Sequence, residues 1–129
     1  MIIDSSALVA IMYLEDQADS FARAIQAAET CRISAATFVE TSIVVEKGSG
    51  DSGIRQLDAF LRDAGIVIEP FTVEQAYDAR QAYSDYGKGR HPAGLNLGDC
   101  FSYALAKVAD EPLLFKGSDF RKTDVKVAI

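Results

Sequence analysis

The chain has 129 residues, of which 49% are hydrophobic and 25% are charged, a balance that argues against a disordered protein. We expect a single domain over residues 1–129, because this length can bury a hydrophobic core without metal or disulfide staples. The only cysteines, Cys31 and Cys100, lack CxxC spacing, which argues against a zinc knuckle or a disulfide framework and favours a reducing, cytoplasmic location.

The charge is unevenly distributed along the chain. The formal net charge of −6 argues against a nucleic-acid partner, since phosphate binding normally requires a basic surface. However, residues 1–79 hold 5 basic and 13 acidic side chains, whereas residues 80–129 hold 8 basic and 6 acidic ones, so any polyanion would bind the C-terminal part. The longest apolar run, residues 7–14, follows no basic leader and is too short to span a bilayer, so we expect a soluble, unexported protein.

Short apolar runs alternate with segments of helical periodicity. In chain order, the pattern predicts a strand at 1–4, helices at 7–14 and 16–31, a strand at 32–34, helices at 35–47 and 54–64, a strand at 66–70, a helix at 73–86, a loop at 87–96, a helix at 97–109 and strands at 112–115 and 125–129. Ser5 or Ser6 is expected to cap the first helix. Strands separated by helices predict an α/β fold with a parallel sheet covered on both faces, whose ligands bind beyond the carboxyl ends of the strands.

Two aspartates are predicted at that edge of the sheet. Asp4 directly follows the first strand, and Asp119 in the turn GSDF follows the strand at 112–115. Each has a simpler interpretation. Asp4 can accept hydrogen bonds from nearby backbone N–H groups, and Asp119 can be a solvated turn residue.

Two further acids lie within predicted helices. Glu40 lies in the largely apolar segment SAATFVETSIVVE, and its alternative role is a capping box with Thr37. Asp99 lies near the start of the helix at 97–109, where it can cap the helix together with Asn96. The neighbours of Glu40 that we expect in the core are Phe38, Val39, Ile43 and Val44.

If these acids converge, their charges predict a cation site. Three or four carboxylates without basic partners repel one another, and a divalent cation relieves that repulsion. Oxygen ligands suit Mg²⁺ or Mn²⁺, whereas the lack of a cluster of histidines and cysteines disfavours zinc. The only histidine, His91, is expected on a loop surface rather than in a catalytic pair.

Four motifs resemble, in order, those of the PIN-domain ribonucleases, and specifically of the VapC-type toxins of bacterial toxin–antitoxin pairs. They are IIDSSALVAI, SAATFVET, GLNLGDCFSYALA and PLLFKGSDF, and together they span nearly the whole chain. The resemblance implies a three-layer α/β/α sandwich with a central parallel sheet. It also implies a metal-dependent endoribonuclease that uses Mg²⁺ or Mn²⁺ to activate water, without a protein nucleophile.

The resemblance also assigns roles by motif position. The residues that it makes catalytic and metal-binding are Asp4, Glu40, Asp99 and Asp119. Ser6 is a supporting residue that can hold Asp4 or a metal-bound water, or simply cap the first helix. Ser118 is a second supporting candidate; many relatives carry an acid or asparagine there, so the fourth contribution rests mainly on Asp119.

Basic residues near these acids are candidates for RNA binding. They are Lys88, Arg90, His91 and Lys116, and an ordinary solvated loop is the alternative interpretation. The resemblance makes transfer RNA or ribosomal RNA a reasonable substrate, although the loop offers no readable sequence code.

We expect a cognate antitoxin that holds the enzyme inactive, since an unchecked ribonuclease would harm its host, and we also expect a homodimer. The segments SSALVAIMYL and SAATFVETSIVVE carry more apolar surface than one core requires, which indicates a groove for a partner peptide or a homodimer face, with ordinary core packing as the alternative.

Two other functions fit an acidic α/β protein of this size. A receiver-like phosphoacceptor domain would need an acidic pair after the first strand and an acceptor aspartate after a later one, which DSS, RIS and IVIEP do not supply. A Mg²⁺-dependent phosphatase would need a second aspartate, DxD, where this chain has DSS.

Overall fold

The computed structural model describes residues 1–129 as four strands, five α-helices and one short 3₁₀ helix. In chain order these are β1 (Ile2–Ile3), α1 (Ser5–Met12), α2 (Ala18–Ala27), β2 (Cys31–Ser34), α3 (Ala35–Asp63), β3 (Ile66–Glu69), α4 (Val73–Tyr86), α5 (Leu97–Ala109), β4 (Leu113–Leu114) and η1 (Phe120–Lys122). None of the helices combines the length and apolar character that a membrane span requires.

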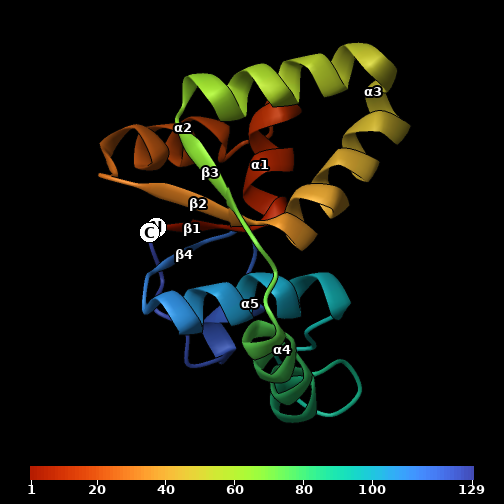
Figure 1. The fold of residues 1–129 in the computed structure, drawn as a ribbon, viewed down its shortest axis with the longest axis vertical. Coiled ribbons are helices and arrows are strands. Elements are labelled where there is room, and N and C mark those ends of the chain that lie inside the picture. The colour runs from red at the N-terminus through yellow and green to blue at the C-terminus, as the bar shows by residue number, and fades with distance from the viewer.

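The strands form one parallel sheet in the order β3-β2-β1-β4. Helices α1, α2 and α3 cover one face of this sheet, and α4 and α5 cover the other (Figure 1). The expected three-layer α/β/α sandwich is therefore confirmed. Because all strands run in the same direction, their carboxyl ends meet at one edge.

The two residues of β1 face opposite sides of the sheet. Ile2 belongs to the core formed with α4 and α5, whereas Ile3 belongs to the core formed with α1, α2 and α3. Neither side chain is accessible to solvent. A strand buried on both sides in this way is apolar throughout, which explains the run that opens the sequence.

Several expected boundaries are wrong. The helix expected at 16–31 spans only Ala18–Ala27, and Cys31 already belongs to β2. Asp4, rather than Ser5 or Ser6, is the N-cap of α1, so the helix begins at Ser5 and ends at Met12. The strand expected at 125–129 is reduced to a single bridge between Val127 and Leu113, because no other residue of β4 pairs with this segment.

The helices expected at 35–47 and 54–64 form one element, α3, which bends at Gly50. Gly50 has φ 61° and ψ −154°, a conformation that essentially only glycine adopts. The bend sends the second limb of α3 across the top of α1 (Figure 1). The sequence GSG therefore marks the break between two helical limbs, as the sequence predicts.

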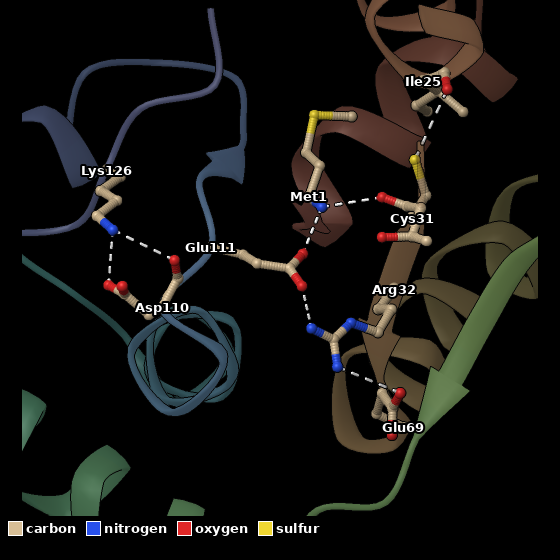
Figure 2. Close-up of polar contacts among 9 residues, drawn as sticks. Met1, Ile25, Cys31, Arg32, Glu69, Asp110, Glu111 and Lys126 are labelled. Carbon is tan, nitrogen blue, oxygen red and sulfur yellow. Dashed lines mark hydrogen bonds and ion pairs between the residues drawn. The ribbon is translucent and has the colours of Figure 1, made fainter. Parts of the chain in front are cut away.

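Charged groups on or next to the strands are paired with one another (Figure 2). Arg32 of β2 forms ion pairs with Glu111, which precedes β4, and with Glu69 of β3 at 3.5 Å. The amino group of Met1 also pairs with Glu111 and donates a hydrogen bond to the carbonyl of Thr30 at 2.9 Å. Although burial acts to raise the pKa of Glu111, its two cationic partners lower it. Glu69 and Glu111 thus each have a cation beside them.

Replacing Gly50 with alanine should destabilise the fold. A Cβ at this position would contact nothing within 4 Å, so the cost comes from the backbone conformation alone. We expect Gly50→Ala to lower the free energy of unfolding by about 1–3 kcal/mol in urea denaturation. The control is Ser52→Ala, at an exposed helical position where alanine is tolerated. Equal stability of the two variants would contradict the assigned bend.

Candidate metal centre

Asp4 is the most deeply buried acid at the carboxyl edge of the sheet. It leaves β1 with its backbone N–H bonded to the carbonyl of Leu114, and only 2% of its surface is exposed. Its Oδ2 accepts hydrogen bonds from Ser6 N at 3.0 Å and Ser6 Oγ at 2.6 Å, and its Oδ1 accepts one from Ser102 Oγ at 2.6 Å. All three donors are neutral. The carboxylate is therefore oriented without its charge being neutralised.

Ser6 holds Asp4 as the sequence predicts. The Ser6 hydroxyl also accepts a hydrogen bond from the backbone N–H of Lys116 at 3.0 Å. This bond ties the start of α1 to the segment after β4, which carries Asp119. Ser6 is therefore a link between two of the four predicted acids.

Glu40 and Asp99 come together across the helices α3 and α5. Glu40 is half-buried, and its carboxylate lies directly against the backbone of Gly98, where an added Cβ would overlap it. Asp99 is the next residue along α5. Glycine at position 98 therefore permits the close approach of Glu40 to the start of this helix.

Asp99 also caps the helix that carries it. Its Oδ2 accepts a hydrogen bond from the N–H of Asn96 at 3.0 Å, and the Asn96 side chain accepts one from the N–H of Asp99 at 2.9 Å. The capping box considered for Asp99 is thus present, whereas the one considered for Thr37 and Glu40 is absent. Helix α3 begins earlier, with Ser34 as its N-cap.

The acids interact electrostatically despite their distance in sequence. The pKa of the Asp99 carboxyl is raised to about 6, mainly by burial, against the lowering effect of its bond from Asn96. The negative charges of Asp4, Glu40 and Asp119 contribute to the same rise. The four predicted acids therefore share one region of negative potential.

None of these four acids has a cationic partner, in contrast to Glu111 and Glu69. Asp119 is exposed in the turn before η1, and Ser118 beside it is exposed and makes no side-chain hydrogen bond. No three acidic, histidine or cysteine side chains already lie together at the spacing of metal ligands. The four carboxylates thus lie in one region but do not converge on one point. Hydrogen bonds hold Asp4 and Asp99 in place.

The predicted RNA-binding residues differ in the contacts that their side chains make. The Lys88 side chain is exposed and unpaired, and the Arg90 guanidinium lies 5.9 Å from the centre of the Tyr83 ring. His91 accepts a hydrogen bond from the N–H of Ala93 at 3.0 Å and packs against Tyr86, a role within the loop itself. Lys116 pairs with Glu15 at the surface.

A groove of about 620 Å³ opens between α4 and α5, beside the start of α5. Its lining is mainly apolar and includes Phe71, Tyr83, Leu97 and Phe101, with Arg80 and Lys88 among the lining residues. Leu97 and Cys100 lie on either side of Asp99 in the sequence, so the groove lies beside the first turn of α5.

Sequence reasoning missed three residues that shape the site: Thr37, Gly98 and Ser102. Thr37 was considered as a helix cap with Glu40, and neither Gly98 nor Ser102 was given a role. The distance of Ser102 from Asp4 in sequence, 98 residues, left no local signal for their hydrogen bond.

A family model described as PIN domain matches residues 1–126. "Ribonuclease VapC" of Mycolicibacterium smegmatis is 51% identical over 125 residues, which cover 97% of this chain and 97% of that protein. The chain therefore belongs to the PIN-domain family and, within it, to the VapC ribonucleases.

Two solved structures support the same fold. VapC20 of Mycobacterium tuberculosis, described as a sarcin-ricin loop cleaving toxin, aligns with a TM-score of 0.80 at 14% identity and covers 99% of this chain and 97% of its own. VapBC2 of Rickettsia felis, bound to a DNA fragment from its promoter, aligns with a TM-score of 0.76 at 16% identity, covering 98% and 94%.

The raised pKa of Asp99 predicts how stability changes with pH in the absence of metal. Between its ordinary pKa of 3.8 and about 6, the folded protein binds this proton more tightly than the unfolded chain, so stability falls as pH rises. Asp99→Asn removes this titration but keeps an acceptor for the N–H of Asn96. As the pH rises from 4 to 7, we expect the free energy of unfolding of the variant to increase by about 1–2 kcal/mol relative to that of wild type.

Urea denaturation in EDTA at both pH values measures this gain. A difference between wild type and Asp99→Asn that is the same at pH 4 and pH 7 would contradict the shared negative potential.

Proposed function

We propose that this protein is an endoribonuclease toxin that requires Mg²⁺ or Mn²⁺, with Asp4, Glu40, Asp99 and Asp119 as catalytic and metal-binding residues. The observation that carries the proposal is that these four acids, from four separate segments, share one negative region without a cationic partner. Membership of the VapC ribonucleases supports the reaction class.

The donor set fits a hard divalent cation. All the candidate ligands are carboxylate oxygens, and hydroxyls and backbone N–H groups surround them instead of thiolates or imidazoles. A cation would relieve the repulsion that raises the pKa of Asp99. It would draw Glu40, Asp99 and Asp119 closer, while Asp4 is already oriented.

The proposal gives each acid a role in phosphodiester hydrolysis. When bound, the cation supplies Lewis-acid chemistry that activates a water and neutralises charge on the scissile phosphate. Asp4 would hold the cation with a carboxylate that Ser6 and Ser102 already orient. Glu40 and Asp99 complete the ligand set from α3 and α5, and Asp119 adds charge from the exposed turn, with Ser118 beside it.

Basic side chains in the loop at 87–96 and at Lys116 support an RNA substrate. Lys88 and Arg90 lie in the loop at 87–96 and have no carboxylate partner, so their charges are available to phosphates. Lys116 can join them by exchanging Glu15 for a phosphate, and His91 shapes the loop. We propose transfer RNA or ribosomal RNA as the substrate and the cytoplasm as the place of cleavage.

An exposed apolar surface on α1 and α3 supports an antitoxin partner. Val39, Ile43 and Val44, which were expected in the core, are instead exposed on α3. Tyr13 and Leu14 at the end of α1 are also exposed, and the Ser49 hydroxyl donates to Tyr13 at 3.3 Å, so the end of α1 lies against α3. We propose that these five apolar residues, Tyr13, Leu14, Val39, Ile43 and Val44, bind an antitoxin segment.

A second apolar surface supports a homodimer. Val73 and Tyr77 of α4 and Leu97 of α5 are exposed near the groove. Apolar side chains gathered in this way are typical of subunit interfaces. We therefore propose that a second copy of the chain binds at α4 and α5.

Substitution of the acids should abolish RNA cleavage and leave the fold intact. Asp4→Asn, Glu40→Gln and Asp99→Asn each remove one candidate ligand, and we expect activity with Mg²⁺ or Mn²⁺ to fall at least about 100-fold. The control is Glu46→Gln, an exposed acid on the same helix as Glu40. Cleavage of structured RNA is measured on gels, and circular dichroism reports folding.

Wild-type protein that leaves transfer and ribosomal RNA intact with either metal would refute the proposed reaction. Variants that cut RNA at the wild-type rate would instead show that the site is misassigned.

A charge on the apolar surface of α1 and α3 should prevent antitoxin binding. Leu14→Asp and Ile43→Asp place a carboxylate where an apolar contact is proposed, and we expect co-purification with the antitoxin encoded beside the gene to be lost. Val108→Asp, at an exposed position on α5, is the matched control. Retained binding by both α1 and α3 variants would show that the partner binds elsewhere.

A further inference from the structure

Three buried polar side chains form a line of hydrogen bonds beneath the acids. Ser102 Oγ lies 2.6 Å from Asp4 Oδ1, and Thr37 Oγ1 lies 3.2 Å from Ser102 Oγ. Thr37 and Ser102 have no exposed surface, and Asp4 has 2%. The three residues come from α3, α5 and the start of α1, so this line, the hydroxyl bridge, joins three elements that do not follow one another in sequence.

The chemistry of the groups determines the direction of these bonds. A carboxylate only accepts hydrogen bonds, so the single hydroxyl proton of Ser102 is donated to Asp4. The bond between the two hydroxyls must then be donated by Thr37. This differs from the neighbouring residues of α3, because Thr41 and Ser42 donate to the backbone carbonyls one turn earlier, at 2.9 and 2.8 Å.

Each hydroxyl of the bridge lies three residues from an acid on the same helix. Thr37 lies three residues before Glu40 on α3, and Ser102 lies three residues after Asp99 on α5. Residues at this spacing are neighbours on one side of a helix. Each helix therefore contributes one hydroxyl to the bridge and, one turn away, one acid to the site.

Counting lone pairs shows what the bridge does to Asp4. Each carboxylate oxygen has about two acceptor positions. Both positions of Oδ2 are used by Ser6, whereas Oδ1 has Ser102 as its only donor. One acceptor position of Oδ1 remains, and the Ser102 hydroxyl determines which way it faces.

We propose that Thr37 and Ser102 are positioning residues for the cation. They orient the free position of Asp4 Oδ1, and they hold α3 and α5 at the spacing that Glu40 and Asp99 require. This inference rests on the proposed function, since it concerns the same site. Removal of either hydroxyl therefore weakens cation binding, beyond any effect on the stability of the fold.

The experiment compares two substitutions of Thr37 with opposite consequences. Thr37→Val keeps the shape of the side chain and removes the donor, whereas Thr37→Ser keeps the donor and removes a methyl group. Isothermal titration calorimetry of Mg²⁺ or Mn²⁺ into the metal-free full chain gives the Kd of each cation. We expect Thr37→Val to weaken binding about tenfold and Thr37→Ser to remain close to wild type.

A packing role for Thr37 predicts the reverse order, because valine fills the site and serine leaves a cavity. Thr41→Val is the matched control: Thr41 is equally buried on the same helix, but its hydroxyl bonds within that helix. We expect its Kd to equal that of wild type. Thermal melts of each metal-free variant report folding separately.

Ser102→Ala tests the same bridge from α5 and serves if Thr37→Val does not fold. A Kd for Ser102→Ala equal to that of wild type would overturn the inference, as would equal Kd values for Thr37→Val and Thr37→Ser. Failure of wild type to bind either cation is a different result, since it would refute the proposed metal dependence itself.

Discussion

The candidate site depends on one constraint, the repulsion between partly buried carboxylates. Asp4 lies almost completely out of solvent with only neutral hydrogen-bond donors, and the pKa of Asp99 is raised to about 6 by burial and by neighbouring acids. The opposite arrangement occurs in the same sheet, where Arg32 and the amino group of Met1 pair with Glu111 (Figure 2). In the proposed function, these unpaired acids would serve a cation that comes from outside the chain.

The N-termini of two helices reduce the energetic cost of placing these unpaired acids together. Asp4 is the N-cap of α1 and Asp99 lies in the first turn of α5, and the positive end of the helix dipole favours a negative charge at both places. Parallel strands bring these starts to the same edge of the sheet (Figure 1). The role of Asp99 in capping its helix and its place among the acids are therefore compatible, because one carboxylate oxygen serves the backbone while the charge acts on its neighbours.

How much the sequence could predict depends on whether a signal is local. The helices at 73–86 and 97–109 are confirmed at both ends, because periodicity and capping residues lie within the segments themselves. Val39 and Ile43 were wrongly expected in the core, since periodicity shows that a helix face is apolar but not what covers it. The hydroxyl bridge could not be predicted, because Ser102 and Asp4 meet only through the tertiary fold.

The central claim is that Asp4, Glu40 and Asp99 bind one divalent cation between them. The most direct measurement is the anomalous scattering of Mn²⁺ in crystals grown with the ion. The account predicts a Mn²⁺ peak within about 2.0–2.3 Å of carboxylate oxygens from these acids, with Asp4 bound through Oδ1. A Mn²⁺ ion bound elsewhere, or no ion beside these carboxylates at saturating Mn²⁺, would contradict it.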